Sequence, residues 1–338
     1  MKLIFRADGN SETGLGHMFR LFALVEIYKD NYDYIFITRS NSTLDVIPKE
    51  YNLQVIPESI EINEEPIWLE ENFTSNEYFI IADGYHFNSN YQLALKNMGY
   101  KLMYIDDLAK EKMYADIVVN HSLTLTPSDF EGSKDTIYAL GAKYAVLRPS
   151  FLQEASQKRE INSIKNIFVC FGGADFYNLT EKCVKGLLKL KTIDKISVVV
   201  GSAYKHKEIF DLEKDNKDKI TIHKSLSEQD MIKLMKNCQL AIVPTSTISY
   251  EICAVKMVVL GGYYIDNQYN IYKGFVENEL IYAAEDFNEY TPDDFKSQVD
   301  MILNDDKNNY HLKINQQQKL FDGKQKTHFL ELIQQAIC

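Results

Sequence analysis

Residues 2–20 read KLIFRADGNSETGLGHMFR, and the rest of the chain is organised around this stretch. It opens with the apolar run Lys2-Leu3-Ile4-Phe5, which is typical of a buried strand, and continues through a loop that carries Gly14 and Gly16. From Phe19 onward apolar residues recur at helical spacing. The stretch therefore predicts a strand, a glycine-bearing loop and the start of a helix.

This loop has the properties of a ligand site. Gly14 and Gly16 carry no Cβ, so a ligand can approach the main chain closely, and the first N–H groups of a helix have no intrahelical partner. His17 follows the loop and is the best candidate for acid–base work, because imidazole titrates near neutrality. A position at a helix N-terminus should favour its neutral form. The alternative, that His17 only packs against or caps the helix, stays open at this point.

Strand-like and helix-like runs alternate along the first half of the chain. The strand-like runs are residues 3–7, 34–38, 53–56, 78–83, 102–106 and 117–120. A polar, charged passage follows and looks like a hinge, after which the pattern begins again with strand-like runs at 166–171, 196–200, 240–243 and 258–260. Continuous apolar strands separated by helices indicate parallel sheets that are covered on both faces.

Two such halves predict an α/β protein with two Rossmann-like domains whose parallel sheets face each other across a cleft, the GT-B layout. We place the N-terminal domain at residues 1–150, the hinge at 151–165 and the C-terminal domain at 166–320. The last segment, 321–338, is expected to form a helix that packs back on the N-terminal domain. Ligands of open α/β sheets collect at the carboxyl ends of the strands.

Composition restricts the classes of function. The chain has 338 residues, 45% of them hydrophobic and 25% charged, which is the profile of a globular protein that can bury a full core. No membrane span or signal sequence is visible, so we expect a cytoplasmic protein without stable membrane association. A net charge of −11 argues against a nucleic-acid partner.

Metal and redox sites are not indicated. The chain has five cysteines and none forms a CxxC pair, so we expect reduced thiols. The histidines show neither HxH nor HExxH spacing. Asp106-Asp107 resembles a metal-binding acidic pair but follows a strand in the wrong half of the fold, and we interpret it as a strand-end turn.

A second glycine-bearing loop follows the first strand of the second half. Gly172 and Gly173 can present main-chain N–H groups to a diphosphate, with Asp175 beside them. The segment from Asn178 to Glu181 has the spacing of a capping box that opens the next helix. A tight turn without a ligand is an equally plausible interpretation of either glycine loop.

Hydroxyl groups gather after a later strand, at Ser246 and Thr247. Glu251 follows one turn into the next helix, where it could bind a ribose diol. The plainer interpretation is a helix cap followed by a solvated glutamate.

These motifs together resemble a known family. In order and spacing, the chain is similar to the UDP-sugar hydrolases of pseudaminic acid biosynthesis, which act on UDP-2,4-diacetamido-2,4,6-trideoxy-β-L-altropyranose. The resemblance is carried by Arg6-x-Asp8, Gly14-x-Gly16-His17-x-x-Arg20, Asp83-x-Tyr85, Phe171-Gly172-Gly173-x-Asp175, Ser246 to Glu251, and Asn267-Gln268. Ala174 and Tyr250 depart from the family pattern, where Thr and Asn are expected.

The resemblance implies a GT-B fold and a reaction without metal or cofactor, in which water attacks the anomeric carbon with inversion and UDP is released. It implies that His17 is the general base. It further implies a sugar site and a nucleotide site. The sugar-site residues would be Asp8, Gly14, Gly16, Arg20, Tyr85, Asn267 and Gln268, and the nucleotide-site residues Gly172, Gly173, Asp175, Ser246, Thr247 and Glu251.

Two other functions remain open from the sequence. A glycosyltransferase of the same fold would use an acceptor hydroxyl in place of water. A nucleotide-sugar binding module would have no catalysis, so loss of His17 would leave its behaviour unchanged. The UDP-sugar is the expected partner in each case, and the sequence does not determine the oligomeric state.

Overall fold

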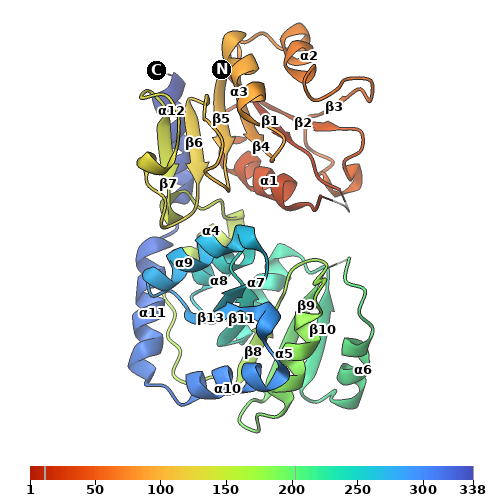
Figure 1. Cartoon of the computed structure of the whole chain (residues 1–338), viewed down its shortest axis with the longest axis vertical. Coiled ribbons are helices and arrows are strands. Elements are labelled where there is room, and N and C mark those ends of the chain that lie inside the picture. Colours follow the sequence, from red (N-terminus) through yellow and green to blue (C-terminus); the bar gives the residue numbers. More distant parts are fainter. Residues whose placement is uncertain (11–12, 202, 338) are drawn as a thin grey trace. The chain divides into compact units, whose positions relative to one another are not determined.

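The structure, a computed structural model, describes residues 1–10, 13–201 and 203–337 (Figure 1). Ser11 and Glu12 of the first loop and the thiol of Cys338 lie outside these described residues. The chain divides into two compact units. Unit 1 comprises Met1–Pro149 and Lys324–Cys338, and unit 2 comprises Ser150–Gly323.

Unit 1 is built on a parallel sheet of seven strands in the order β3-β2-β1-β4-β5-β6-β7. The first six strands confirm the runs expected from the sequence. The seventh was not predicted from the sequence; it is a short edge strand whose residues are mostly half-buried. The strands are β1 (Lys2–Ala7), β2 (Tyr34–Arg39), β3 (Leu53–Ile56), β4 (Tyr78–Asp83), β5 (Lys101–Ile105), β6 (Ile117–Asn120) and β7 (Ile137–Leu140).

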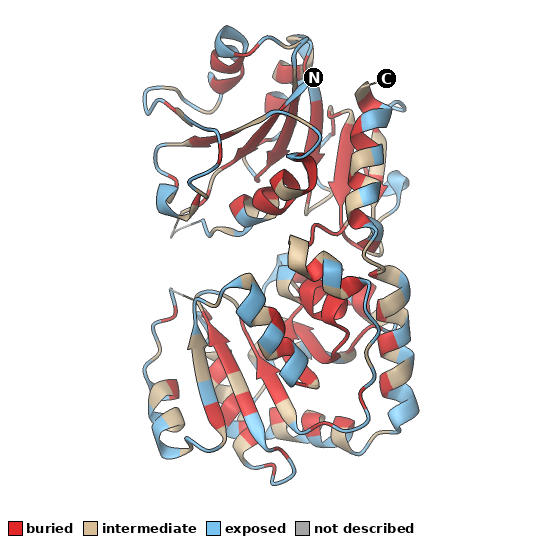
Figure 2. Ribbon diagram, turned by 180° about the vertical axis from the view of Figure 1, so that it is seen from behind, coloured by how far each residue is buried: buried red, intermediate tan, exposed pale blue. Residues whose placement is uncertain are grey.

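Helices cover both faces of this sheet. One face carries α1 (Gly16–Tyr28) and α12 (Gln325–Ile337), which lie side by side, and the Tyr28 hydroxyl donates to the Phe329 carbonyl at 2.7 Å. The other face packs Trp68 and Leu95 of α2 (Glu65–Asn72) and α3 (Ser89–Asn97) against alternate strand residues. The central strands are buried as a result (Figure 2).

Unit 2 repeats this plan with a parallel sheet of six strands in the order β10-β9-β8-β11-β12-β13. Both sheets share the strand order of doubly wound nucleotide-binding folds. The predicted pair of parallel-sheet domains is thus confirmed, although β10 and β13 were not expected. The strands are β8 (Asn166–Val169), β9 (Lys195–Val200), β10 (Ile220–Lys224), β11 (Leu240–Pro244), β12 (Val258–Tyr263) and β13 (Tyr282–Asp286).

The helices of unit 2 also lie on both faces of its sheet. Alternate strand residues pack against α5 (Leu179–Leu188), α6 (Glu208–Asp215) and α10 (Pro292–Leu303) on one face. The other helices are α4 (Pro149–Ala155), α7 (Glu228–Asn237), α8 (Thr247–Val255), α9 (Tyr269–Glu277) and α11 (Lys307–Leu320). Part of the predicted hinge is therefore helical, because proline is favourable in the first turn of α4.

The start of α5 corrects one prediction. Asn178 has a left-handed backbone with φ of 51° and makes no side-chain cap, so the expected capping box from Asn178 to Glu181 is wrong. Asp175 caps the helix instead, since its carboxylate accepts from the N–H groups of Leu179 at 2.9 Å and Thr180 at 2.8 Å. The loop before α5 brings the Asp175 side chain over the first turn of the helix, so these N–H groups are satisfied by a residue that precedes the predicted capping box.

A helix cap and several short turns complete the description of the secondary structure. Helix α10 follows Thr291, with a complete capping box and Pro292 in the first turn. In the described residues five short 3₁₀ turns complete the assignment: Leu44–Val46, Pro127–Asp129, Ala142–Tyr144, Asp266–Gln268 and Phe287–Glu289. No helix within the described part of the chain has the length and apolar character needed to cross a bilayer.

Candidate active site

The topology of unit 1 creates its site. Strand β1 pairs with β2 on one side and β4 on the other, so the strand order reverses there, and such switch points are where open α/β sheets bind ligands. Ala7 at the end of β1 lies opposite Asp83 at the end of β4. The chain leaves β1 through the glycine loop and enters α1 at Gly16. The first turn of α1 therefore reaches the side chains at this edge of the sheet.

His17 pairs with Asp83 at this switch point. The imidazole Nδ1 lies 2.7 Å from Asp83 Oδ1, and Asp83 is fully buried. Burial alone would raise the pKa of Asp83, but Arg20 and His17 outweigh it and lower the pKa below its usual value. An ionised carboxylate only accepts hydrogen bonds, so we assign the proton to Nδ1. This tautomer leaves the lone pair of Nε2 available to accept a proton.

Arg20 holds Asp83 in place. Its Nε donates to Asp83 Oδ2 and its Nη2 to Asp83 Oδ1, both at 2.6 Å. The same guanidinium donates to both oxygens of Asp107, at 2.7 and 2.9 Å, and its Nη1 lies 3.2 Å from His121 Nε2. These contacts use all five N–H groups of the side chain. Arg20 Nη2 also lies 3.2 Å from His17 Nδ1, so this side chain contacts both members of the His17–Asp83 pair.

His121 completes this cluster in its neutral form. Burial and the nearby Arg20 charge lower the pKa of His121 to about 4. Its Nδ1 then donates to the Tyr144 carbonyl at 3.3 Å, and Nε2 accepts from Arg20. The prediction of a simple turn at Asp106-Asp107 was incomplete, because Asp107 follows β5 but pairs with Arg20.

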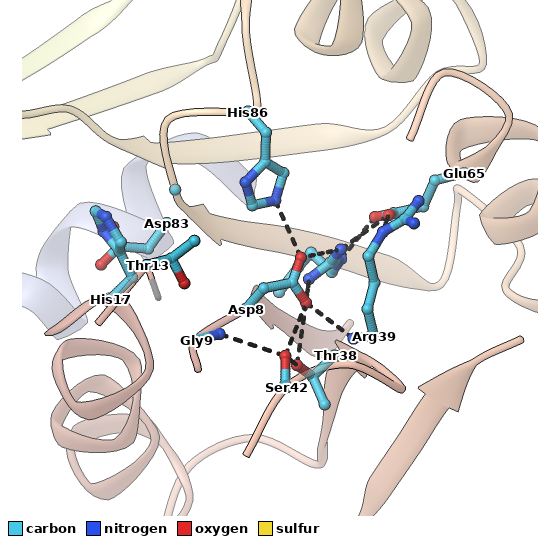
Figure 3. A network of polar contacts seen from close by, with 12 residues as sticks. Asp8, Gly9, Thr13, His17, Thr38, Arg39, Ser42, Glu65, Asp83 and His86 are labelled. Atoms are coloured by element: carbon cyan, nitrogen blue, oxygen red, sulfur yellow. Dashed lines mark hydrogen bonds and ion pairs between the residues drawn. The ribbon is translucent and has the colours of Figure 1, made fainter. Parts of the chain in front are cut away.

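A second network surrounds Asp8 (Figure 3). Arg6 is fully buried and binds Asp8 and Glu65 with two hydrogen bonds each, at 2.6 and 2.8 Å in both cases. Asp8 also accepts from the Thr38 hydroxyl at 3.0 Å and the Arg39 backbone N–H at 2.8 Å. Burial would raise the pKa of Asp8, but Arg6 above all lowers it, so this carboxylate is ionised. Most of its lone pairs are used within the protein.

A cavity of about 410 Å³ lies next to both networks. Its lining includes Asp8, His17, Arg39, Tyr85 and His86. Tyr85 is half exposed, and its ring meets the His17 ring edge to face with centroids 4.8 Å apart. Three of the residues expected from the sequence, Asp8, His17 and Tyr85, are thus brought to one cavity.

The two loop glycines have different requirements. Gly14 has a φ of 83°, a left-handed conformation that strains other residues. A Cβ at Gly16 would meet no atom within 4 Å, so the space beside the first turn of α1 is open. Leu15 precedes this turn and makes no side-chain cap.

Unit 2 has a corresponding switch point where β8 lies between β9 and β11. Gly172 has a φ of 88°, and a Cβ on Gly201 would lie 2.4 Å from Gly173, so these two backbones pack closely. Gly173 is exposed and Asp175 is buried. The carboxylate of Asp175 is used by the helix cap described above, so in this structure it faces α5.

The residues after β11 lie at the same edge of this sheet. Ser246 precedes α8 and is half-buried, and Thr247 is exposed. Glu251 is 6% exposed, so the solvated glutamate considered above is excluded. The pKa of the Cys170 thiol is raised to about 11, mainly by burial; a hydrogen bond from the Gly172 N–H opposes this rise, and the charges of Glu251 and Asp175 add to it. The negative charges of Glu251 and Asp175 therefore both influence Cys170, the residue that follows β8.

Asn267 and Gln268 lie in the short turn after β12. Asn267 is exposed, whereas Gln268 is buried and its side-chain oxygen accepts from the Tyr264 N–H at 3.0 Å. The Thr245 hydroxyl donates to the Gln268 carbonyl at 3.2 Å. Gln268 therefore joins Thr245, which follows β11, to Tyr264, which follows β12, through these hydrogen bonds.

Four residues at this site were given no role from the sequence: Asp83 was quoted only as part of a motif, Asp107 was interpreted as part of a turn, and His121 and Arg39 were not singled out. Each follows or ends a strand at the carboxyl edge of the first sheet, which is the only signal that could have indicated them.

Among residues 1–10, 13–201 and 203–337, no group of three or more histidine, cysteine or acidic side chains could hold a metal ion. The four described cysteines are buried and unpaired with one another.

Comparison with known proteins identifies relatives. No family model matches the chain. The chain is 30% identical over 291 residues to an uncharacterized protein of Methanocaldococcus jannaschii, covering 82% of this chain and 58% of that protein. It is 27% identical over 273 residues to the UDP-2,4-diacetamido-2,4,6-trideoxy-β-L-altropyranose hydrolase of Campylobacter jejuni, covering 79% of this chain and 93% of that one. The resemblance stated from the sequence is confirmed.

Solved structures agree on the fold. The calicheamicin glycosyltransferase CalG4 matches with a TM-score of 0.67 at 8% identity, covering 100% of this chain and 98% of that one. The Anabaena protein HepE, solved with UDP and glucose, matches with a TM-score of 0.62 at 13% identity and covers 99% of both chains. The predicted GT-B fold class is thereby confirmed.

Proposed function

We propose that this protein hydrolyses a UDP-activated diacetamido-trideoxy sugar to UDP and the free sugar in nonulosonic acid biosynthesis. The observation that carries the proposal is the pairing of His17 Nδ1 with the buried carboxylate of Asp83 beside a cavity of sugar size. The similarity to a relative named as a hydrolase of this UDP-sugar supports the choice of substrate.

His17 acts as the general base in this mechanism. Its Nε2 takes a proton from a water molecule while the water oxygen attacks the anomeric carbon. The bond from that carbon to the diphosphate oxygen breaks, its electron pair leaves with UDP, and attack from the opposite face inverts the configuration. Asp83 stabilises the imidazolium that forms, because its negative charge lies 2.7 Å from Nδ1.

The loop of Gly172 and Gly173 receives the diphosphate in this proposal. Exposed main-chain N–H groups at the start of a helix stabilise the charge that develops on departing UDP. Ser246 and Thr247 contribute hydroxyls at the same sheet edge, and Glu251 binds the ribose. No step is assigned to a metal ion.

Transfer to an acceptor is the second candidate, because the matching solved structures include glycosyltransferases. The test is incubation with the UDP-sugar in chelator, without acceptor, while UDP release is followed. Hydrolysis predicts steady release under these conditions. Release only after an acceptor alcohol is added would replace the hydrolase by a transferase.

His17→Ala is expected to lower kcat by about 10²- to 10⁴-fold, the usual contribution of a general base. UDP affinity, measured by calorimetry, should not change, which separates lost catalysis from lost folding. Asp83→Asn should also lower kcat. Because Asp83 acts through His17, the double variant should be no slower than His17→Ala alone. Additive losses would contradict the assigned roles, and full activity of His17→Ala would leave a binding module.

A further inference from the structure

Arg39 has no role in the mechanism above, yet its side chain lines the cavity. It is the last residue of β2, and its backbone N–H donates to Asp8. The guanidinium Nε and Nη2 are buried and make no hydrogen bond within the described residues. Figure 3 shows the side chain beside Glu65.

Glu65 does not satisfy these donors. Its nearest oxygen lies 3.5 Å from Arg39 Nε, an ion-pair distance without a hydrogen bond. Both Glu65 oxygens already accept from Arg6, and Oε1 also accepts from the Tyr91 hydroxyl at 2.6 Å. Leaving the buried donors of a charged group without a hydrogen bond is costly. These N–H groups therefore indicate a ligand acceptor in the cavity.

The charges around the cavity decide the kind of acceptor. Two carboxylates, Asp8 and Glu61, line it together with the single guanidinium of Arg39. Asp8 is ionised, and the positive charge of Arg39 is already balanced by Glu65. An anionic substituent would therefore be repelled, whereas a neutral carbonyl oxygen can accept from Arg39 without a change of net charge. Ile62 adds an apolar wall for a methyl group.

We propose that Arg39 binds the carbonyl oxygen of an N-acyl substituent on the sugar and so determines specificity for N-acylated UDP-sugars. This inference rests on the proposed function, because it places the sugar in the cavity beside His17. A substrate with a hydroxyl in place of that N-acyl group leaves the Arg39 donors unpaired. Discrimination against such a substrate follows from the same cost.

The test compares three substrates: the diacetamido UDP-sugar and the two analogues in which one acetamido group is replaced by hydroxyl. The wild-type protein should disfavour one analogue by about 10- to 100-fold in kcat/KM, the size of a hydrogen bond to a charged group. Arg39→Met keeps the length of the side chain and removes its donors. It should abolish this preference by raising KM for the diacetamido substrate, with a smaller change in kcat.

Lys101→Met provides the matched control. Lys101 is the first residue of β5, so it lies at the amino ends of the strands, away from the carboxyl ends that carry the site. Its partner Asp116 keeps a second cation, Lys96, when Lys101 is replaced. Glu65 likewise keeps Arg6 when Arg39 is replaced. The control should retain the wild-type preference. Arg39→Lys keeps the charge but not the planar pair of donors, and should show an intermediate preference even if Arg39→Met does not fold.

The possible outcomes separate the two proposals. If the wild-type protein releases UDP but the Arg39 variants retain its preference among the substrates, the role of Arg39 is refuted and the hydrolase stands. If the wild-type protein releases no UDP, the hydrolase fails. Calorimetric Kd values for the same three UDP-sugars then decide the role of Arg39 by the same ratios.

Discussion

Arg20 shows how one residue organises the cluster around His17. Its five N–H groups bind Asp83, Asp107 and His121, and these partners come from the ends of three different strands. The resemblance stated from the sequence implied that Arg20 contacts the sugar. The structure assigns its donors to protein groups, so its effect on the reaction is expected to pass through Asp83 and His17.

The neutral state of His121 predicts a pH dependence of stability. Burial and the Arg20 charge lower its pKa from 6.5 to about 4. Between these values the unfolded chain binds a proton that the folded chain does not, so the free energy of unfolding decreases as pH falls from 6.5 to 4. The pKa difference corresponds to roughly 3 kcal/mol, present in full above pH 6.5.

Trp68 is the only tryptophan in the sequence and lies in α2, so its fluorescence reports denaturation of unit 1. Urea titrations at pH 7 and pH 4.5 should show a smaller pH effect for His121→Asn than for the wild-type chain. Equal pH effects in the two proteins would show that His121 does not carry the dependence. The carboxylates with lowered pKa, such as Asp83, lose their contribution only at lower pH.

At the scale of elements, helix starts connect the sequence to the candidate sites. The first turn of α1 carries His17 and Arg20, and the turn before α5 carries the glycines proposed for the diphosphate. Asp175 joins that turn to the helix by capping Leu179 and Thr180. Its removal should therefore loosen both the helix end and the loop.

Asp175→Ala is expected to destabilise the start of α5 by about 1–2 kcal/mol, the usual cost of losing a cap. Hydrogen exchange at the amides of Leu179 and Thr180 measures this directly and should accelerate. Asn178→Gly is the control, because glycine tolerates the φ of 51° and the change, although it removes the contacts of Asn178 with Glu181 and Tyr204, leaves the capped amides bound to Asp175. Equal acceleration in both variants would contradict the assignment of the cap to Asp175.

At the scale of the whole molecule, the chain returns to unit 1 after completing unit 2. Helix α12 supplies buried Phe329, Leu332 and Ile333 next to α1, and the first turn of α1 carries His17. The last residues of the chain thus contribute to the core beneath the candidate active site of unit 1. The sequence expectation placed a terminal helix in residues 321–338, and the structure has α12 at Gln325–Ile337.

Phe329→Ala is expected to destabilise unit 1 by about 3–5 kcal/mol, because it removes a fully buried ring. The Trp68 fluorescence transition in urea should move to lower concentration. Glu331→Ala, on the exposed side of the same helix, should shift it by less than about 0.5 kcal/mol. An unchanged transition in Phe329→Ala would separate α12 from the stability of unit 1.

Much of the fold could be predicted from apolar runs. Strands such as residues 78–83 are buried on both faces and therefore read as continuous apolar segments. Edge strands were missed where this reason fails, as in β10, whose residues after Ile220 are half-buried or exposed. The cap of α5 was misassigned because sequence spacing does not report the left-handed turn at Asn178.

The sequence by itself determined the α/β class, the two parallel sheets, and His17 as the candidate base, because apolar periodicity and glycine loops are local signals. Only the tertiary structure decided which groups act on His17. Arg20 lies 63 residues from Asp83 and 87 from Asp107 in the sequence, and no local pattern encodes such pairings. Parallel strand order brings their ends to one edge, where the buried carboxylate of Asp83 pairs with His17 and Arg39 lines the same cavity as His17.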